Sequence, residues 1–276
     1  MTTTTDQPRT SQGHPEIARR RLTAAEIGAL DPYQLMAELG KTVIHSGGGR
    51  STEELLAMAQ LRPGQRVLDA GCGIGTTAAQ IARRFDCEVV ALDINEANLA
   101  RARCTVDQAG VDDRVTVSRG DIEQLQFADE AFDVVIVEAV TMFVHRKRAA
   151  SEVVRVCRRG GRIVDHEFIW RKPPRPGTRE LFMGKVCPGI DFDTEDDWTG
   201  LYRAAGLEDL RTTTGPFAMM TPVGFLRDEG ALGTARFMGK AISRPAYVRK
   251  MAWLMPRMLR AMPYLGYVVV GGTRPR

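Results

Sequence analysis

The chain has 276 residues, of which 43% are hydrophobic and 26% are charged, and these values are ordinary for a globular protein. The five cysteines are odd in number and show no Cys-x-x-Cys spacing, which argues against a disulfide framework or a zinc site and favours a cytoplasmic location. The first residues do not resemble a secretory signal and no run of about eighteen apolar residues occurs, so we expect no transmembrane segment.

The net charge of +4 is too small to indicate nucleic-acid binding, but the charge is unevenly distributed. Between Arg227 and Arg260 the sequence has eight Lys and Arg residues and only two acids, Asp228 and Glu229, so this segment has a local charge of +6 (8 − 2). The basic character therefore belongs to one segment in the C-terminal part of the chain.

The N-terminal part is expected to consist of a disordered tail followed by helices. Residues 1–15 are rich in Thr, Ser and Gln, a composition typical of disorder. Residues 16–60 have helical periodicity, interrupted by Asp31 and Pro32, which suit an N-cap and the first position of a helix. We interpret residues 16–60 as a helical lid.

A glycine-rich loop at residues 45–49 divides this helical segment. After it, Ser51 and Glu54 have the spacing of a capping box, which predicts the start of another helix. Glycines permit hinge motion, and closure of a lid excludes water from a site. Tyr33 would add an aromatic wall to such a lid.

Residues 61–215 alternate between short apolar runs and helical patterns, which predicts an α/β domain with a parallel sheet. Ligands bind to such sheets beyond the carboxyl ends of the strands. Residues 216–263 are long enough for two or three helices and are expected to form a cap inserted before the last strand, and residues 264–276 hold that strand and a tail. The expected strands are 66–70, 88–93, 115–118, 132–137, 162–165, 207–213 and 267–270, and the expected helices are 76–85, 96–110, 149–158 and 194–205.

A glycine-rich turn follows the first of these strands directly. Its glycines, at positions 71, 73 and 75, are spaced G-x-G-x-G, and Thr76 stands where a dinucleotide-binding G-x-G-x-x-G would need its last glycine. Asp69, two residues before the turn, is awkward beside a pyrophosphate but suits a cationic amino-acid group. Asp93 ends the second strand, where an acid can accept the hydroxyl groups of a ribose.

Together with Gly120-Asp121-Ile122, Phe132-Asp133-Val134-Val135 and Arg159-Gly160-Gly161-Arg162, this turn resembles the motifs of class I methyltransferases that use S-adenosylmethionine (SAM). The resemblance covers roughly residues 55–165. It implies a Rossmann-like, seven-stranded, mostly parallel sheet with helices on both faces, and SAM as the cofactor.

The resemblance also assigns the cofactor-binding residues. Asp69 and the glycine loop would line the methionine end of SAM, Asp93 would hold the ribose, Asp121 with Ile122 would contact the adenine, and Glu138 with Ala139 would lie along the donor. The full expected set is Asp69, Gly71, Cys72, Gly73, Gly75, Thr76, Asp93, Ile94, Asp121, Ile122, Glu138 and Ala139.

Methyl transfer from a sulfonium is an in-line displacement, which needs alignment and desolvation more than acid–base groups. If the acceptor must lose a proton, the first candidate base is His145, seven residues after Glu138, in a segment similar to phosphoethanolamine methyltransferases. The alternative role for His145 is to cap the following helix. His166 and Glu167, at the mouth of the fifth strand, are further catalytic candidates, and no set of ligands predicts a metal.

The acceptor is expected to be a small molecule, because the resemblance is to the branch that includes quinone, tocopherol, sterol and phosphoethanolamine methyltransferases. The predicted cap has many methionines at helical spacing, which predicts either a deformable pocket for a hydrophobic or lipid-like acceptor or a plain core contact. A basic amphipathic helix there could also touch anionic lipid.

Three other functions remain open from the sequence. An NAD(P)-dependent oxidoreductase would use a similar glycine turn, but Asp69 and Thr76 argue against it. A nucleic-acid methyltransferase is disfavoured because Glu138-Ala139 is followed by Val-Thr, not by the Pro-Pro-aromatic pattern typical of base-modifying enzymes. A SAM-binding protein without turnover would have the same motifs.

Overall fold

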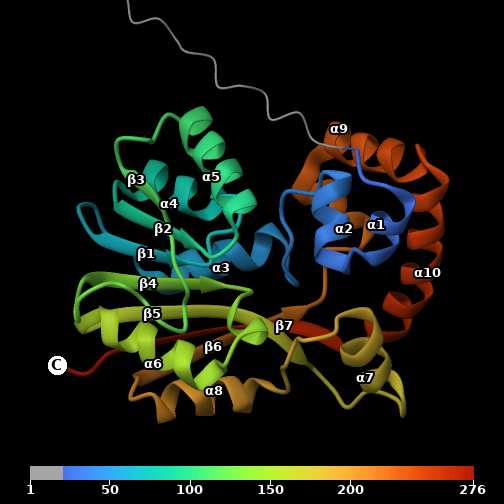
Figure 1. Ribbon diagram of the computed structural model, residues 1–276. Helices are drawn as coiled ribbons and strands as arrows, with labels where there is room; N and C mark the ends of the chain where they lie inside the picture. Colours follow the sequence, from blue (N-terminus) through green and yellow to red (C-terminus); the bar gives the residue numbers. More distant parts are fainter. Residues whose placement is uncertain (1–20) are drawn as a thin grey trace, which may run out of the picture.

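The computed structural model describes residues 21–276, and the predicted tail at residues 1–15 lies outside the described range. Seven strands form one sheet in the order β3-β2-β1-β4-β5-β7-β6 (Figure 1). Within the described residues only β7 runs against its neighbours, so the prediction of a mostly parallel sheet is confirmed. The strands are β1 (Arg66–Ala70), β2 (Glu88–Asp93), β3 (Val115–Arg119), β4 (Phe132–Glu138), β5 (Cys157–Trp170), β6 (Glu208–Pro216) and β7 (Leu265–Thr273).

Helices cover both faces of the sheet. On one face, α3 (Gly49–Ala59), α4 (Thr76–Phe85) and α5 (Glu96–Ala109) bury their apolar sides together with Val134 and Ile136 of β4. On the other, α6 (Arg146–Val156) and α8 (Glu195–Ala204) pack with Val135 and Val137 of the same strand. Successive side chains of a strand point to opposite faces, so a strand buried on both sides needs an uninterrupted apolar run, which β4 has at residues 134–137.

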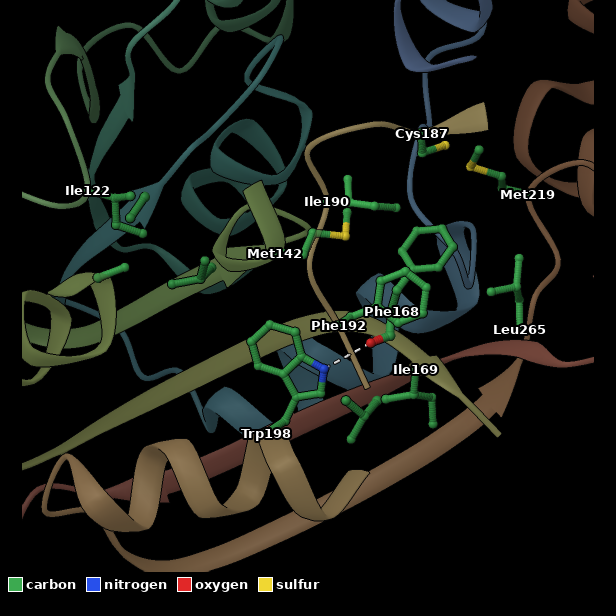
Figure 2. Close-up of a cluster of buried hydrophobic side chains, with 14 of the residues drawn as sticks. Ile122, Met142, Phe168, Ile169, Cys187, Ile190, Phe192, Trp198, Met219 and Leu265 are labelled. Atoms are coloured by element: carbon green, nitrogen blue, oxygen red, sulfur yellow. Dashed lines mark hydrogen bonds between the residues drawn. The ribbon is translucent and has the colours of Figure 1, made fainter. Parts of the chain in front are cut away.

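The second of these cores continues beyond the sheet edge as a cluster of aromatic side chains. Figure 2 shows part of it, where the indole Nε1 of Trp198 donates a hydrogen bond of 2.9 Å to the carbonyl oxygen of Phe168. Phe192 packs against Phe168 with ring centroids 5.5 Å apart. The cluster lies under the lid and cap and supports them.

The lid and the cap form a helical layer beside the carboxyl edge of the strands (Figure 1). The lid contains α1 (Ala24–Ala29) and α2 (Pro32–Leu39), and the cap contains α9 (Pro222–Ile242) and α10 (Pro245–Ala261). Lid and cap contact each other directly, α1 against α10 and α2 against α9. The remaining short elements are η1 (Thr141–Phe143), α7 (Thr178–Leu181) and η2 (Phe182–Val186). No helix within residues 21–276 has both the length and the apolar composition needed to cross a bilayer.

One local prediction about the lid is confirmed, and one is wrong. Asp31 caps α2 and Pro32 is its first residue, as predicted. The capping box at Ser51 does not form, because α3 already begins at Gly49 and the Ser51 hydroxyl donates to the carbonyl of Gly48. In the cap, α10 continues through Pro256, since a proline removes only one helical hydrogen bond and the apolar side of this helix is packed on the core.

The main break in the cap lies instead in α9, at Gly230, which has φ +65°.

Two further boundaries differ around α6 and β5. Helix α6 begins at Arg146, three residues before the predicted start. Strand β5 starts at Cys157, five residues before the predicted start at 162, and continues to Trp170, so it includes the glycine pair at 160–161.

Candidate functional site

A cavity of about 470 Å³ lies at the carboxyl ends of β1, β2 and β4, where the parallel sheet was predicted to bind its ligand. The lid closes one side of it. Ten of the twelve expected cofactor residues line this cavity, namely Asp69, Gly71, Cys72, Gly73, Asp93, Ile94, Asp121, Ile122, Glu138 and Ala139. The structure therefore brings together side chains from four separate strand ends.

The two other residues of the expected set, Gly75 and Thr76, lie in the turn but not on the cavity wall. Gly75 is the N-cap of α4, has φ +79° and packs against α5, where an added Cβ would lie 3.0 Å from the Cβ of Ala102. Thr76 lines a smaller neighbouring cavity of about 390 Å³. Their place in the turn is explained by backbone geometry and helix packing.

Gly71 allows the glycine turn to pack closely against Val140, in the loop that follows β4. It has φ +89°, and an added Cβ would lie 2.3 Å from Cγ2 of Val140, a distance that no relaxed contact reaches. The backbone N–H groups of Gly71 and Cys72 both donate to the carbonyl of Leu92, at 2.7 and 2.8 Å. The turn is thereby fixed to the end of β2, close to Asp93.

Asp93 is held in place at the end of β2 by backbone donors. Its Oδ2 accepts from the N–H of Gly73 at 2.9 Å, and its Oδ1 accepts from the N–H of Asn95 at 2.8 Å. Nδ2 of Asn98 also donates to Oδ1 and Oδ2, but only at 3.5 and 3.4 Å, so hydroxyl donors from a ligand could replace these two long contacts.

Asp69 is the least compensated group on the cavity wall. Its side chain is buried, and its Oδ2 has no hydrogen-bond partner among the described residues. Burial, followed by repulsion from Glu138 and Asp93, raises the pKa of Asp69 to about 8, although a backbone hydrogen bond from Ala78 opposes this. A buried carboxylate of this kind is costly unless a cation neutralises it.

Glu138 and His45 form a network that the sequence did not predict. Thr52 and Thr77 donate hydroxyl hydrogen bonds to the two oxygens of Glu138, at 2.7 and 2.8 Å, and Nε2 of His45 lies 3.4 Å from Oε1. The His45 ring also contacts the hydroxyls of Ser51 and Thr52, at 3.2 and 3.1 Å. His45 lines the cavity but comes from the lid loop, far from Glu138 in sequence, so only the fold reveals the pair.

None of the three expected catalytic residues lines the 470 Å³ cavity. His145 is exposed and is the N-cap of α6, where its Nδ1 accepts from the N–H of Arg148 at 3.4 Å. This position agrees with the alternative interpretation of His145, as the cap of the following helix.

His166 and Glu167 are fully buried behind the site. Burial and the neighbouring His45 lower the pKa of His166, so its imidazole is neutral. Glu167 accepts from the N–H groups of Val140 and Thr141, at 2.9 and 2.6 Å, and burial together with Asp165 raises its pKa. Glu167 therefore fixes the loop that follows β4.

His45, Glu138 and His166 place possible metal-ligand atoms within 4.8 Å of one another. The sequence did not predict this group, because it offered a single histidine near the strand ends. Both ring nitrogens of His45 and both oxygens of Glu138 already have hydroxyl partners. Hydrogen bonding accounts for the arrangement, and we assign no metal to it.

Comparison with known proteins agrees with the site. Residues 68–165, which include β1, the glycine turn, β4 and the first part of β5, match the methyltransferase domain family. This chain is a class I SAM-dependent methyltransferase. The methyltransferase is 29% identical over 221 residues to Methyltransferase GfsG of Streptomyces halstedii, and the alignment covers 72% of this chain and 77% of that protein.

Two solved structures share the fold. A phosphoethanolamine N-methyltransferase of Haemonchus contortus, in complex with phosphomonomethylethanolamine and S-adenosylhomocysteine, superposes with a TM-score of 0.71 at 19% identity, covering 92% of this chain and 58% of that one. The [4+2]-cyclase SpnF has a TM-score of 0.68 at 22% identity, covering 92% and 97%. Because one of them is named a cyclase, the fold alone does not define the reaction.

Proposed function

We propose that the methyltransferase binds SAM in the 470 Å³ cavity and transfers its methyl group to a small hydrophobic acceptor under the lid. The unpartnered Oδ2 of buried Asp69 is the observation that carries this proposal. In the proposed arrangement Asp69 faces the cationic amino-acid end of SAM and Asp93 accepts the ribose hydroxyls. Ile94, Asp121 and Ile122 hold the adenine.

Three acidic residues, Asp69, Asp93 and Glu138, line the cavity, and hydrogen bonds from the backbone of the glycine turn and from threonine hydroxyls hold the last two in place. SAM has a sulfonium and an α-ammonium group, so its charge complements such a wall. A dinucleotide would bring a pyrophosphate to the same place and would be repelled by these acids. The acidic wall therefore favours SAM over NAD(P), the alternative from the sequence.

The part of the cavity that would hold the acceptor is inferred from the apolar residues of the lid and of the connection after β4. Tyr33, Ala37 and Ile44 from the lid, with Phe143 and Val144 from the β4–α6 connection, give the cavity an apolar wall. The rings of Tyr33 and Phe143 meet edge to face, with centroids 5.3 Å apart. This wall supports a hydrophobic or lipid-like acceptor.

The cap methionines do not contribute to that wall. Met219, Met220 and Met258 are buried in the core, and no methionine within residues 21–276 lines the 470 Å³ cavity. These buried positions agree with the second interpretation of the methionine spacing, in which the methionines form a core contact of the cap.

For an acceptor that must lose a proton, we assign the base to His45 instead of His145. His45 lines the cavity, and Glu138, whose Oε1 lies 3.4 Å from Nε2, would stabilise the imidazolium that forms when the ring accepts a proton. Because both ring nitrogens contact hydroxyls, the ring would have to release the Thr52 hydroxyl before Nε2 could accept that proton. His145 is outside the cavity lining and already serves as a helix cap. For the methyl transfer itself the residues supply alignment and exclusion of water.

Calorimetric titration with SAM, S-adenosylhomocysteine and NADH tests the cofactor assignment. We expect SAM and its product to bind, NADH not to bind, and Asp93→Ala to weaken SAM binding, while the exposed Asp112→Ala, used as a control, leaves it unchanged. Binding of NADH alone, or tight and salt-sensitive binding of tRNA, would favour the other functions. Incubation of cell extracts with deuteriomethyl-SAM, followed by mass spectrometry, identifies the acceptor and distinguishes turnover from binding without chemistry.

A further inference from the structure

Helix α9 has a continuous set of exposed apolar side chains on its outer side. Leu232, Met238 and Ile242 are 65%, 55% and 71% exposed, although large apolar side chains are normally buried. Ala235 and Gly239 are exposed between them, so the spacing 232, 235, 239, 242 follows one side of a helix. We call these five residues the α9 apolar face.

The charge around this face is positive. The only two acids between residues 227 and 260 are Asp228 and Glu229, whose side chains are 0% and 5% exposed. Both pair with the buried ammonium group of Lys41, at 3.5 and 3.2 Å. The acids are thus hidden, whereas Arg236 and Arg249 of the same segment are exposed, so the charge that the segment presents to its surroundings is basic.

Helix α9, which carries this face, lies beside the lid helices (Figure 1). Helix α9 packs on α2, and the Nζ of Lys240 lies 2.9 Å from a carboxylate oxygen of Glu38 in that helix. Lys41, which pairs with the acids of α9, also lines the 470 Å³ cavity. A surface that holds α9 would therefore lie next to the lid residues that line the cavity.

We propose that the α9 apolar face docks the methyltransferase on an anionic membrane surface. An interfacial helix buries its apolar side among the acyl chains while basic residues contact the lipid phosphates. A second copy of the chain fits less well, because it would bring two segments of the same positive charge together. The proposal concerns binding to a membrane surface, so it can be tested without measuring turnover. A failure of this test would leave the proposed reaction unaffected.

Co-sedimentation with vesicles tests the proposal. The wild-type protein should bind vesicles that contain phosphatidylglycerol, bind phosphatidylcholine vesicles weakly, and lose binding as salt rises from about 0.1 M to about 1 M. The triple variant Leu232→Ser, Met238→Ser, Ile242→Ser should bind at least about tenfold more weakly, because each side chain loses its apolar contribution. Arg236→Gln should bind several-fold more weakly to the anionic vesicles only.

Leu259→Ser serves as the matched control, because Leu259 is 59% exposed but lies towards the other end of α10, and it should bind like the wild type. The triple variant should keep the wild-type melting temperature and affinity for SAM, since none of its three positions lines the cavity. Equal binding to both kinds of vesicle, or full binding by the triple variant, would overturn the proposal. So would lipid-free dimerisation of the wild type that the triple variant abolishes, because the occupant would then be a second copy.

Discussion

Changing Asp69 to Asn tests the cofactor site through its dependence on pH. Burial raises the pKa of Asp69 to about 8 in the free protein, and bound SAM would place positive charge beside the carboxylate and lower that pKa again. SAM binding should therefore release a proton below pH 8. One pH unit below 8 about one Asp69 in ten is ionised, so SAM should bind about tenfold, or 1.4 kcal/mol, more weakly at pH 7 than at the plateau.

Calorimetric titration between about pH 6 and pH 8.5 measures this effect, and buffers with different ionisation enthalpies report the released proton directly. The α-amino group of SAM itself titrates near 7.7–8.0, so Asp69→Asn supplies the baseline. The variant should bind SAM more weakly at pH 8 and show no proton release from the protein. A wild-type affinity that stays constant between pH 6 and pH 8, or a variant that binds as tightly as the wild type, would refute the role of Asp69.

The same carboxyl should act in the opposite direction on stability. Its folded pKa lies above the unfolded value of 3.8, so its contribution is fully present below pH 3.8 and is lost as pH rises towards 8. Without SAM, Asp69→Asn should therefore raise the free energy of unfolding at pH 7 by a few kcal/mol, to an order of magnitude. Thermal denaturation of the free protein at pH 5 and pH 7 measures this, and the gain should be larger at pH 7.

Five further substitutions, at four residues, test other parts of the site. With an acceptor that must lose a proton, His45→Ala should lower turnover roughly a hundredfold or more, whereas His145→Ala should cost only about 1 kcal/mol of stability as a lost cap; equal turnover in both variants would contradict the assignment. Glu167→Gln should keep or raise the melting temperature at pH 7, because the protonated acid resembles an amide, whereas Glu167→Ala should cost about 3 kcal/mol by leaving two buried N–H groups unpaired. Gly71→Ala should lower SAM affinity at least about tenfold, since its Cβ would overlap Val140 and its φ is positive, and a titration with SAM would show it.

The cofactor half of the site was predictable because its signals are local. A strand, a glycine turn and a helix follow one another directly in the chain, and Asp69 and Asp93 are each defined by the end of an apolar run. Parallel strands bring such ends to one edge whatever the details of the rest of the fold. Sequence reasoning therefore located ten residues of the cavity wall without knowledge of any contact.

The catalytic half was not predictable in the same way, and two physical reasons can be named. Helix α6 starts three residues earlier than its periodicity suggests, and this small shift moves His145 from a loop beside the acceptor to a helix cap. The pairing of His45 with Glu138 depends on how the lid folds over the sheet, a long-range contact that no local spacing records.

The acidic cavity also accounts for the ion pairs that join the lid to the cap. A wall with three carboxylates and one unpartnered oxygen weakens the free protein, so the surrounding structure must hold it closed by contacts elsewhere. Lys41 provides one such contact, since it is buried on the wall yet directs its charge away from it, to the acids of α9. If Lys41 instead pointed into the cavity, it would neutralise Asp69 and compete with the cation of SAM. The ion pair with Asp228 and Glu229 therefore does two things at once: it fastens lid to cap, and it directs the charge of Lys41 away from Asp69.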